Sequence, residues 1–128
     1  MNLLVDSHTL LWSYFEPARL SATAANELTD PSNCVFVSPA SHWEIAIKMS
    51  IGKLQIAETF PDFVQHAIKD NGWSFLPIEA SHSAELIGLP FRHRDPFDRL
   101  IIAQAIVEKM PIISIDSIFD AYPIRRIW

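Results

Sequence analysis

Glycine is scarce in this chain of 128 residues, which contains only Gly52, Gly72 and Gly88, each isolated from the others. The glycine-rich loops that bind phosphates, G-x-x-x-x-G-K-[ST] and G-x-G-x-x-G, therefore occur nowhere in it. Nucleotide binding through either loop is excluded.

Cysteine is nearly absent as well: Cys34, inside an apolar run, is the only one. One cysteine can form neither a disulfide framework nor a zinc site made of thiolates, so we expect a protein of the reducing cytoplasm. The start, MNLLVDSH, lacks the basic segment of a signal peptide. No apolar run reaches the length of about 20 residues that a membrane-spanning helix needs, so we expect no membrane association.

An excess of basic residues is also missing. Ten basic and fifteen acidic residues give a net charge of −5, which argues against the broad basic face of a duplex DNA binder. A nucleic-acid enzyme is still compatible with this charge, because bound metal ions would offset a site made of carboxylates. Hydrophobic residues make up 49% of the chain, enough for one core, and we expect a single domain over residues 1–128.

Short apolar runs alternate with segments of helical periodicity. The expected strands are Asn2–Val5, Cys34–Val37, Trp73–Ile78, Ile112–Ile115 and Ile124–Ile127. The expected helices are Ser7–Phe15, Ser21–Thr29, Pro39 to about Ile51, Phe60–Lys69, Ala80–Gly88 and Pro96–Lys109. Continuous apolar strands between helices predict an α/β fold, with a parallel sheet covered on both faces. Ligands of such sheets bind beyond the carboxyl ends of the strands.

Acidic residues follow two of the expected strands directly. Asp6 follows the first and Asp116 the fourth, so both belong at the ligand-binding edge, although either could simply cap the next helical segment. Glu44 lies about 40° from the line through Ala40, Ile47 and Ile51 of its helix, on the face expected to pack on the sheet. A buried carboxylate needs a partner, either a metal ion or a cation such as Lys48 one turn on.

The run HRDPFDRLIIAQA holds two more aspartates. Asp95 before Pro96 is a typical N-cap, with proline at the first helical position. Asp98, at the third position, could favour the helix dipole, but the apolar helix behind it should be buried, so its carboxylate should point into the same crevice as Asp6 and Asp116. We expect Asp95→Asn to cost mainly stability, and Asp98→Asn to spare the fold and remove cleavage.

Four acids, Asp6, Glu44, Asp98 and Asp116, could thus converge. Clustered carboxylates repel one another, and a bound divalent cation would offset this repulsion. Oxygen ligands favour Mg²⁺ or Mn²⁺ over zinc. Such a metal site suits phosphoryl chemistry. His42-x-Glu44 matches half of a zinc-deaminase pattern whose other half needs two cysteines. His93 is a candidate for assisting substrate binding, and the four tryptophans are expected in the core or in interfaces.

Taken in order, LLVDSHTLLW, VSPASHWEIAIKMSIGKL, LPFRHRDPFDRLIIAQA and IISIDSIFDAY resemble the PIN-domain ribonucleases over essentially the whole chain. The resemblance is greatest to the VapC-type toxins of type II toxin–antitoxin pairs. It implies a three-layer PIN-like fold with a central parallel sheet of about five strands, and cleavage of RNA with Mg²⁺ or Mn²⁺. The acidic quartet of the family falls on Asp6, Glu44, Asp98 and Asp116.

The resemblance also implies individual roles. Asp6 and Asp98 would bind the metal directly, Asp116 would complete its shell directly or through water, and Glu44 would position or deprotonate the attacking water. Ser114 would be the supporting hydroxyl beside the last acid. A homodimer and a small antitoxin that occupies the active-site groove are the implied partners. The basic residues nearest the site, candidates for RNA phosphate contacts or plain surface charges, are Arg92, Arg94, Arg99, Lys48 and Lys53.

The hypothesis is a metal-dependent endoribonuclease, a hydrolase in which metal-activated water attacks an RNA phosphodiester. Two alternatives are a small metal-dependent phosphomonoesterase and a PIN-like RNA- or protein-binding module without catalysis. The acidic quartet disfavours the binding module, which has no need of mutually repelling carboxylates.

Overall fold

A five-stranded parallel sheet forms the centre of the computed structural model, which describes residues 1–128. Its strand order is β3-β2-β1-β4-β5, and every neighbouring pair is parallel. The strands are β1 (Asn2–Val5), β2 (Cys34–Val37), β3 (Ser74–Phe75), β4 (Ile112–Ile113) and β5 (Arg126–Ile127). The predicted α/β class, the parallel sheet and its five strands are confirmed.

The three later strands are shorter than predicted. β3 ends at Phe75, and although the Leu76 N–H still donates to the Val37 carbonyl at 2.9 Å, Pro77 has no N–H with which to continue the ladder. β4 ends at Ile113, although the Ser114 N–H still donates to the Ile127 carbonyl of β5 at 3.2 Å, and Ile115 is already 47% exposed. Apolar composition alone thus overestimated the length of the ladder.

Six α-helices accompany the sheet. They are α1 (Ser7–Phe15), α2 (Ala22–Thr29), α3 (Pro39–Ser50), α4 (Phe60–Ala67), α5 (Ala80–Ile87) and α6 (Pro96–Glu108). The predicted helix Phe60–Lys69 divides into α4 and a 3₁₀ turn, Lys69–Asn71, which Gly72 ends with φ of 73°, the left-handed conformation that glycine adopts without strain. None of the helices is long and apolar enough to cross a membrane.

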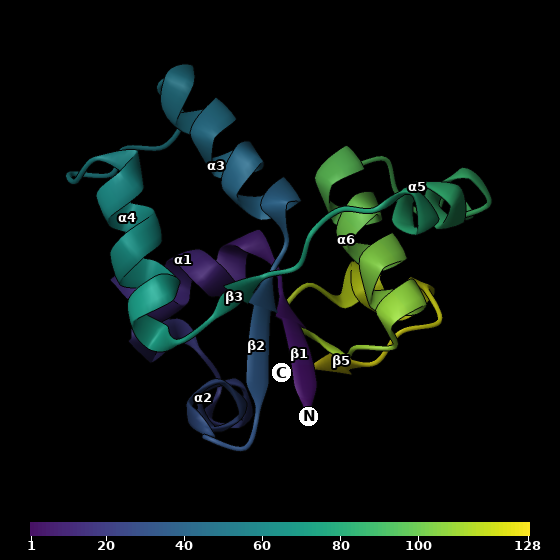
Figure 1. Ribbon diagram of the computed structural model, residues 1–128, viewed down its shortest axis with the longest axis horizontal. Coiled ribbons are helices and arrows are strands. Elements are labelled where there is room, and N and C mark those ends of the chain that lie inside the picture. Colours follow the sequence, from purple (N-terminus) through teal and green to yellow (C-terminus); the bar gives the residue numbers. More distant parts are fainter.

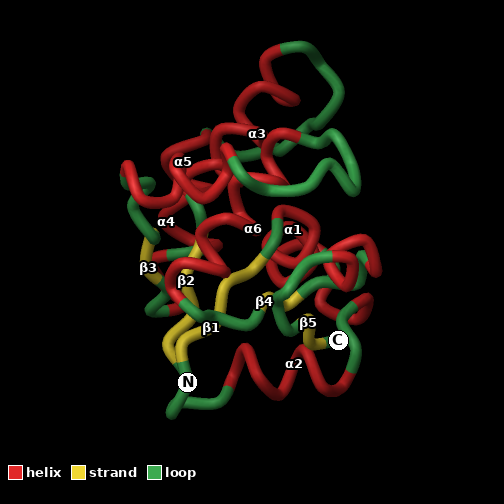
Figure 2. Tube along the Cα trace, turned by 90° about the vertical axis from the view of Figure 1, so that its right-hand side faces the viewer, coloured by secondary structure: helices red, strands yellow, loops and turns green.

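The helices cover both faces of the sheet (Figures 1 and 2). Leu3 and Val5 of β1 point into a core shared with α1, α2 and α4. Leu4, between them in sequence, points into a second core shared with α5 and α6. Alternate residues of one strand thus serve opposite layers, which explains why β1 is apolar throughout.

Helix α3 projects beyond the carboxyl end of the sheet, as Figure 1 shows. Only its first half is buried, through Ala40, Ser41, Glu44 and Ile45. Ile51, which we expected on the packed face, is 60% exposed, because the helix has passed the edge of the sheet by then. The overhang places Glu44 at the boundary between the core and the open strand ends.

Candidate active site

Asp6 and Ser114 meet at the carboxyl ends of adjacent strands. Asp6 follows β1 and Ser114 follows β4, which pairs with β1 through Val5 and Ile113. The Ser114 hydroxyl donates to Asp6 Oδ2 at 2.6 Å, while the Thr9 N–H donates to Asp6 Oδ1 at 2.8 Å. The Asp6 carboxylate therefore caps α1 and is held at both oxygens, so the capping and active-site interpretations of this residue are compatible.

The environment of Asp6 opposes its ionisation. The side chain is almost fully buried, and this burial raises its pKa above the ordinary value of 3.8, against the hydrogen bonds from Ser114 and Thr9, which lower it. A carboxylate in this position gains from a nearby cation.

Glu44 is buried at the start of the overhang, as its helical position predicted. The Ser7 hydroxyl donates to its Oε1 at 2.7 Å, and Lys48 Nζ lies 3.2 Å from its Oε2. The ion pair with Lys48, one of the two kinds of partner considered for this carboxylate, therefore forms. Ser7 gave no sequence signal beyond its place after Asp6, and its contact depends on α1 and α3 lying side by side.

The electrostatic effect of the other acids is clearest in the pKa of Asp98. Its pKa is raised to about 7, chiefly by burial, then by the negative charges of Asp95, Asp6, Glu44 and Asp116, in that order. The four acids selected from the sequence thus share one electrostatic environment. Asp95 carries out the predicted capping role, accepting from the N–H groups of Phe97 at 3.0 Å and Asp98 at 2.9 Å.

Asp116 is the exposed member of the set. Its side chain accepts from the Ile118 N–H at 3.0 Å and caps the short 3₁₀ helix Ser117–Ala121. Its own N–H donates to Ser114 Oγ at 3.0 Å. Ser114, whose side chain is fully buried, therefore connects the backbone of Asp116 to the carboxylate of Asp6.

The donor set suits a hard cation, because it consists of carboxylate and hydroxyl oxygens with no thiolate. The raised pKa of Asp98 is the effect that a cation would relieve. However, no three acidic, histidine or cysteine side chains are placed so that together they could hold a metal ion. The acids form an electrostatic cluster whose carboxylates would have to draw closer to share one cation.

The candidate basic residues differ sharply in exposure. The exposed ones are Arg92, Arg94 and Lys53, and Lys48 is partly exposed. Arg99, by contrast, is buried and donates to the carbonyls of Leu89 at 2.9 Å and Pro90 at 2.7 Å. The expectation that Arg99 contacts RNA phosphates is therefore wrong. Its guanidinium binds the carbonyls of the segment between α5 and α6 instead.

The structure adds two residues that sequence reasoning did not select. Tyr122, 4% exposed, places its hydroxyl 2.7 Å from His93 Nδ1, and His93 Nε2 lies 3.5 Å from Asp98 Oδ2. Trp43, expected in the core or an interface, is 62% exposed and packs edge-on against Phe97, with ring centroids 5.7 Å apart. Trp43 is therefore not a core residue.

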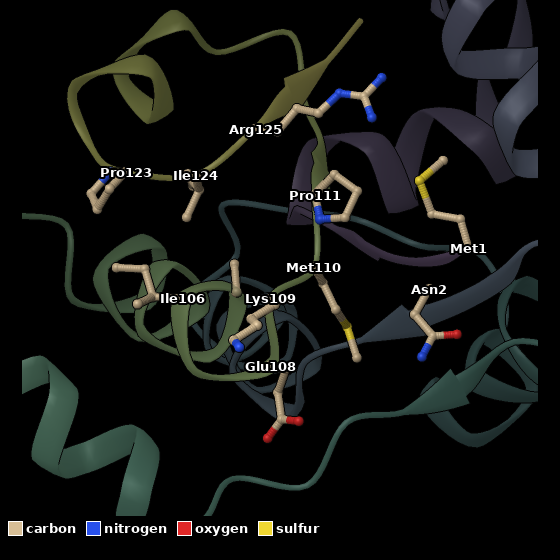
Figure 3. A pocket seen from close by; sticks show the side chains of 11 residues that line it. Met1, Asn2, Ile106, Glu108, Lys109, Met110, Pro111, Pro123, Ile124 and Arg125 are labelled. Atoms are coloured by element: carbon tan, nitrogen blue, oxygen red, sulfur yellow. The ribbon is translucent and has the colours of Figure 1, made fainter.

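A pocket of about 580 Å³ lies at the other end of the sheet (Figure 3). Its lining includes Met1, Asn2, Lys109, Pro111 and Arg125, from the starts of β1 and β4 and the end of α6. None of the four acids lines it. The chemistry expected of the carboxylates therefore belongs to the carboxyl ends of the strands and not to this pocket.

Comparisons with known proteins agree with this architecture. The family model described as PIN domain matches residues 3–124. Ribonuclease VapC16 of Mycobacterium tuberculosis is 37% identical over 70 residues, which make up 52% of this chain and 50% of that relative, so the match spans only half of the relative's length.

Solved structures resemble the chain over nearly its whole length. A chain in the crystal structure of VapBC2 from Rickettsia felis, bound to a DNA fragment from its promoter, has a TM-score of 0.68 at 13% identity and covers 98% of this chain and 97% of its own. A chain of VapBC-1 from nontypeable Haemophilus influenzae has a TM-score of 0.67 at 11% identity, and the match covers 98% of this chain and 96% of that chain. At such identities these likenesses show the fold alone. With its parallel sheet, its acids at the strand ends and a family match over residues 3–124, the chain belongs to the PIN domain family.

Proposed function

We propose that this protein is a metal-dependent endoribonuclease and the toxin of a type II toxin–antitoxin pair. The observation that carries the proposal is the environment of Asp98 in a chain of the PIN family: burial, then the negative charges of Asp95, Asp6, Glu44 and Asp116, raise its pKa to about 7. The partial match to a relative named Ribonuclease VapC16 supports the same activity.

The cation, Mg²⁺ or Mn²⁺, would be held by Asp6 and Asp98, with Asp116 completing the shell directly or through water. When bound, it would lower the pKa of the attacking water and stabilise negative charge on the phosphate. Asp6 presents a carboxylate already oriented by Thr9 and Ser114, so little side-chain entropy is lost on binding.

Glu44 is the residue that would position or deprotonate the attacking water. Ser7 and Lys48 hold its two oxygens, so the carboxylate is fixed in direction and can position or deprotonate the nucleophile. In-line attack on phosphorus would leave a 5′-phosphate and a 3′-hydroxyl. Arg92, Arg94 and Lys48 are the proposed contacts to RNA phosphates.

The proposed partners are a second copy of this chain and a cognate antitoxin. The similarity in fold to chains of VapBC2 and VapBC-1 supports a partner of the VapB kind. Cytoplasmic action fits a chain whose only cysteine is exposed and unpaired.

A single set of incubations tests the activity. The purified protein is mixed with defined RNAs and, separately, with a phosphomonoester, in Mg²⁺, in Mn²⁺ and in EDTA, beside the Asp98→Asn and Glu44→Gln variants. We expect metal-dependent RNA cleavage that EDTA and both substitutions remove.

Other results point to other functions. Binding of RNA without cleavage under every metal condition would indicate a binding module, and hydrolysis of the phosphomonoester alone would indicate a phosphatase. Copurification of the chain with the protein encoded by a short neighbouring reading frame would test the toxin–antitoxin assignment independently.

A further inference from the structure

His93 lies against Asp98 through a nitrogen that has no hydrogen-bond partner. Its Nε2 is buried and unpaired, and Asp98 Oδ2 is 3.5 Å away, slightly beyond hydrogen-bond distance. An unpaired buried nitrogen costs free energy, so a small movement of the Asp98 carboxylate toward the ring would be favourable.

The contacts of the Tyr122 hydroxyl favour one tautomer of His93. The Tyr122 oxygen is 2.7 Å from His93 Nδ1 and also receives the backbone N–H of His93 at 3.3 Å and Nη1 of Arg99 at 3.5 Å. Because two N–H groups already approach this oxygen, its own proton is best placed on Nδ1. The neutral ring then carries its proton on Nε2, the nitrogen that faces Asp98.

Arg99 and Phe91 hold this arrangement in place. The Arg99 guanidinium lies 4.0 Å from the centroid of the Phe91 ring and donates to the Leu89 and Pro90 carbonyls. The segment that carries His93 is thereby fixed to the same helix, α6, that carries Asp98 near its start. His93 lies in the loop before α6, and the contacts of Arg99 tie this loop to the helix that carries Asp98.

We propose that His93, with its tautomer set by Tyr122, is a positioning residue for Asp98. After the small movement of the carboxylate described above, the His93 Nε2–H donates to Oδ2 of ionised Asp98 and leaves the second oxygen to face the cation-binding cluster. The consequence for catalysis rests on the proposed function. Outer partners that orient a ligating carboxylate typically contribute about 10- to 100-fold to metal affinity or activity.

A merely structural role is the competing explanation, since His93 also joins its loop to Tyr122. Two substitutions separate the roles, because the glutamine amide reaches the position of Nε2 and the asparagine amide that of Nδ1. His93→Gln keeps a donor toward Asp98, whereas His93→Asn keeps only the contact with Tyr122. The two variants are matched in polarity, and their thermal unfolding shows whether either is misfolded.

Calorimetric titration with Mn²⁺ and RNA cleavage kinetics are the first two measurements. We expect His93→Asn to weaken Mn²⁺ binding and lower kcat by about 10- to 100-fold with KM for RNA unchanged, and His93→Gln to stay close to wild type. Equal losses in both variants, or losses in neither, would overturn the proposal.

A third measurement does not depend on metal or RNA. Long-range ¹H–¹⁵N NMR of the metal-free protein, under conditions where the spectrum shows the ring to be neutral, should show His93 protonated on Nε2 and bare on Nδ1. In Tyr122→Phe, which lacks the donor to Nδ1, that preference should weaken. A wild-type ring protonated on Nδ1 would overturn the positioning role, whereas a wild-type protein with the expected tautomer that neither binds Mn²⁺ nor cuts RNA would overturn the proposed function alone.

Discussion

Ser114 donates a hydrogen bond of 2.6 Å to the Asp6 carboxylate across 108 residues of sequence. The contact exists because β1 and β4 are neighbours and end at the same edge of the sheet. The same hydroxyl accepts the backbone N–H of Asp116. One small side chain thus fixes two of the four acids relative to each other.

Ser114→Ala should raise the pKa of Asp6 further, because the Ser114 hydrogen bond is the largest influence that lowers it. A raised carboxyl pKa stabilises the fold below the ordinary value of 3.8, and this stability is lost as pH rises through the folded pKa. At neutral pH the variant should therefore lose about 1–3 kcal/mol of unfolding free energy, and less in acid. Urea unfolding at several pH values measures this, and Ser114→Thr, which retains the hydroxyl, is the control. A loss that is the same at every pH would contradict the role of Asp6.

Asp98→Asn should stabilise the protein in the absence of metal. The folded pKa of about 7 against the ordinary 3.8 means that Asp98 favours folding fully below pH 3.8 and loses that contribution as pH rises through about 7. Removing the charge should therefore raise the unfolding free energy above neutral pH by up to about 4 kcal/mol, an upper bound because salt screens the repulsion.

Thermal unfolding at pH values on both sides of 7 checks this, with and without Mg²⁺. Wild type should gain stability from Mg²⁺ while Asp98→Asn should not, since a metal ligand must be ionised to bind. A variant that is less stable than wild type at alkaline pH would show that Asp98 has a structural partner instead.

Substitutions at Asp95 should separate its hydrogen bonds from its charge. Asparagine caps a helix about as well as aspartate, so Asp95→Asn should not mainly cost stability, as the sequence suggested; it removes the negative charge with the largest effect on the pKa of Asp98. The acid limb of the pH profile for cleavage should move to lower pH with little change in stability. Asp95→Ala should cause the same pH shift and in addition cost about 0.5–2 kcal/mol. A pH profile that neither substitution moves would show that Asp95 does not act on Asp98.

Alanine substitution should affect RNA binding at Arg92 and Arg94 but stability at Arg99. Arg92→Ala and Arg94→Ala should weaken RNA binding and each reduce the slope of log K against log salt by about 0.7, the value for one phosphate contact on a single strand. Arg99→Ala should mainly lower the melting temperature, because it removes the donor to the buried carbonyl of Leu89 and to the partly buried carbonyl of Pro90.

Lys69→Ala, at an exposed cation on the 3₁₀ turn after α4, is the control for nonspecific charge loss. Binding assays across a salt series and thermal unfolding distinguish the three arginines. An unchanged salt slope in both exposed-arginine variants would remove them from the RNA interface.

The sequence anticipated much of the fold for local reasons. Apolar runs predicted the five strands, and the cap at Asp95 lies where the sequence predicted it, because a cap needs only its own side chain and the next few N–H groups. The burial of Glu44 also followed from helical periodicity. The periodicity of α3 failed at Ile51, since it cannot show where the neighbouring sheet ends.

The sequence by itself determined the order of strands and helices along the chain, since each element depends on a local pattern. It also determined that acids follow the strands, and the ends of parallel strands lie at one edge of the sheet. Only the tertiary structure decided that Ser7 would hold Glu44, that Tyr122 would meet His93, and that Arg99 would be buried. Each of these contacts joins different elements of the chain. Whether such a pair meets depends on how helices pack across the sheet, a geometry that no local pattern in the sequence encodes.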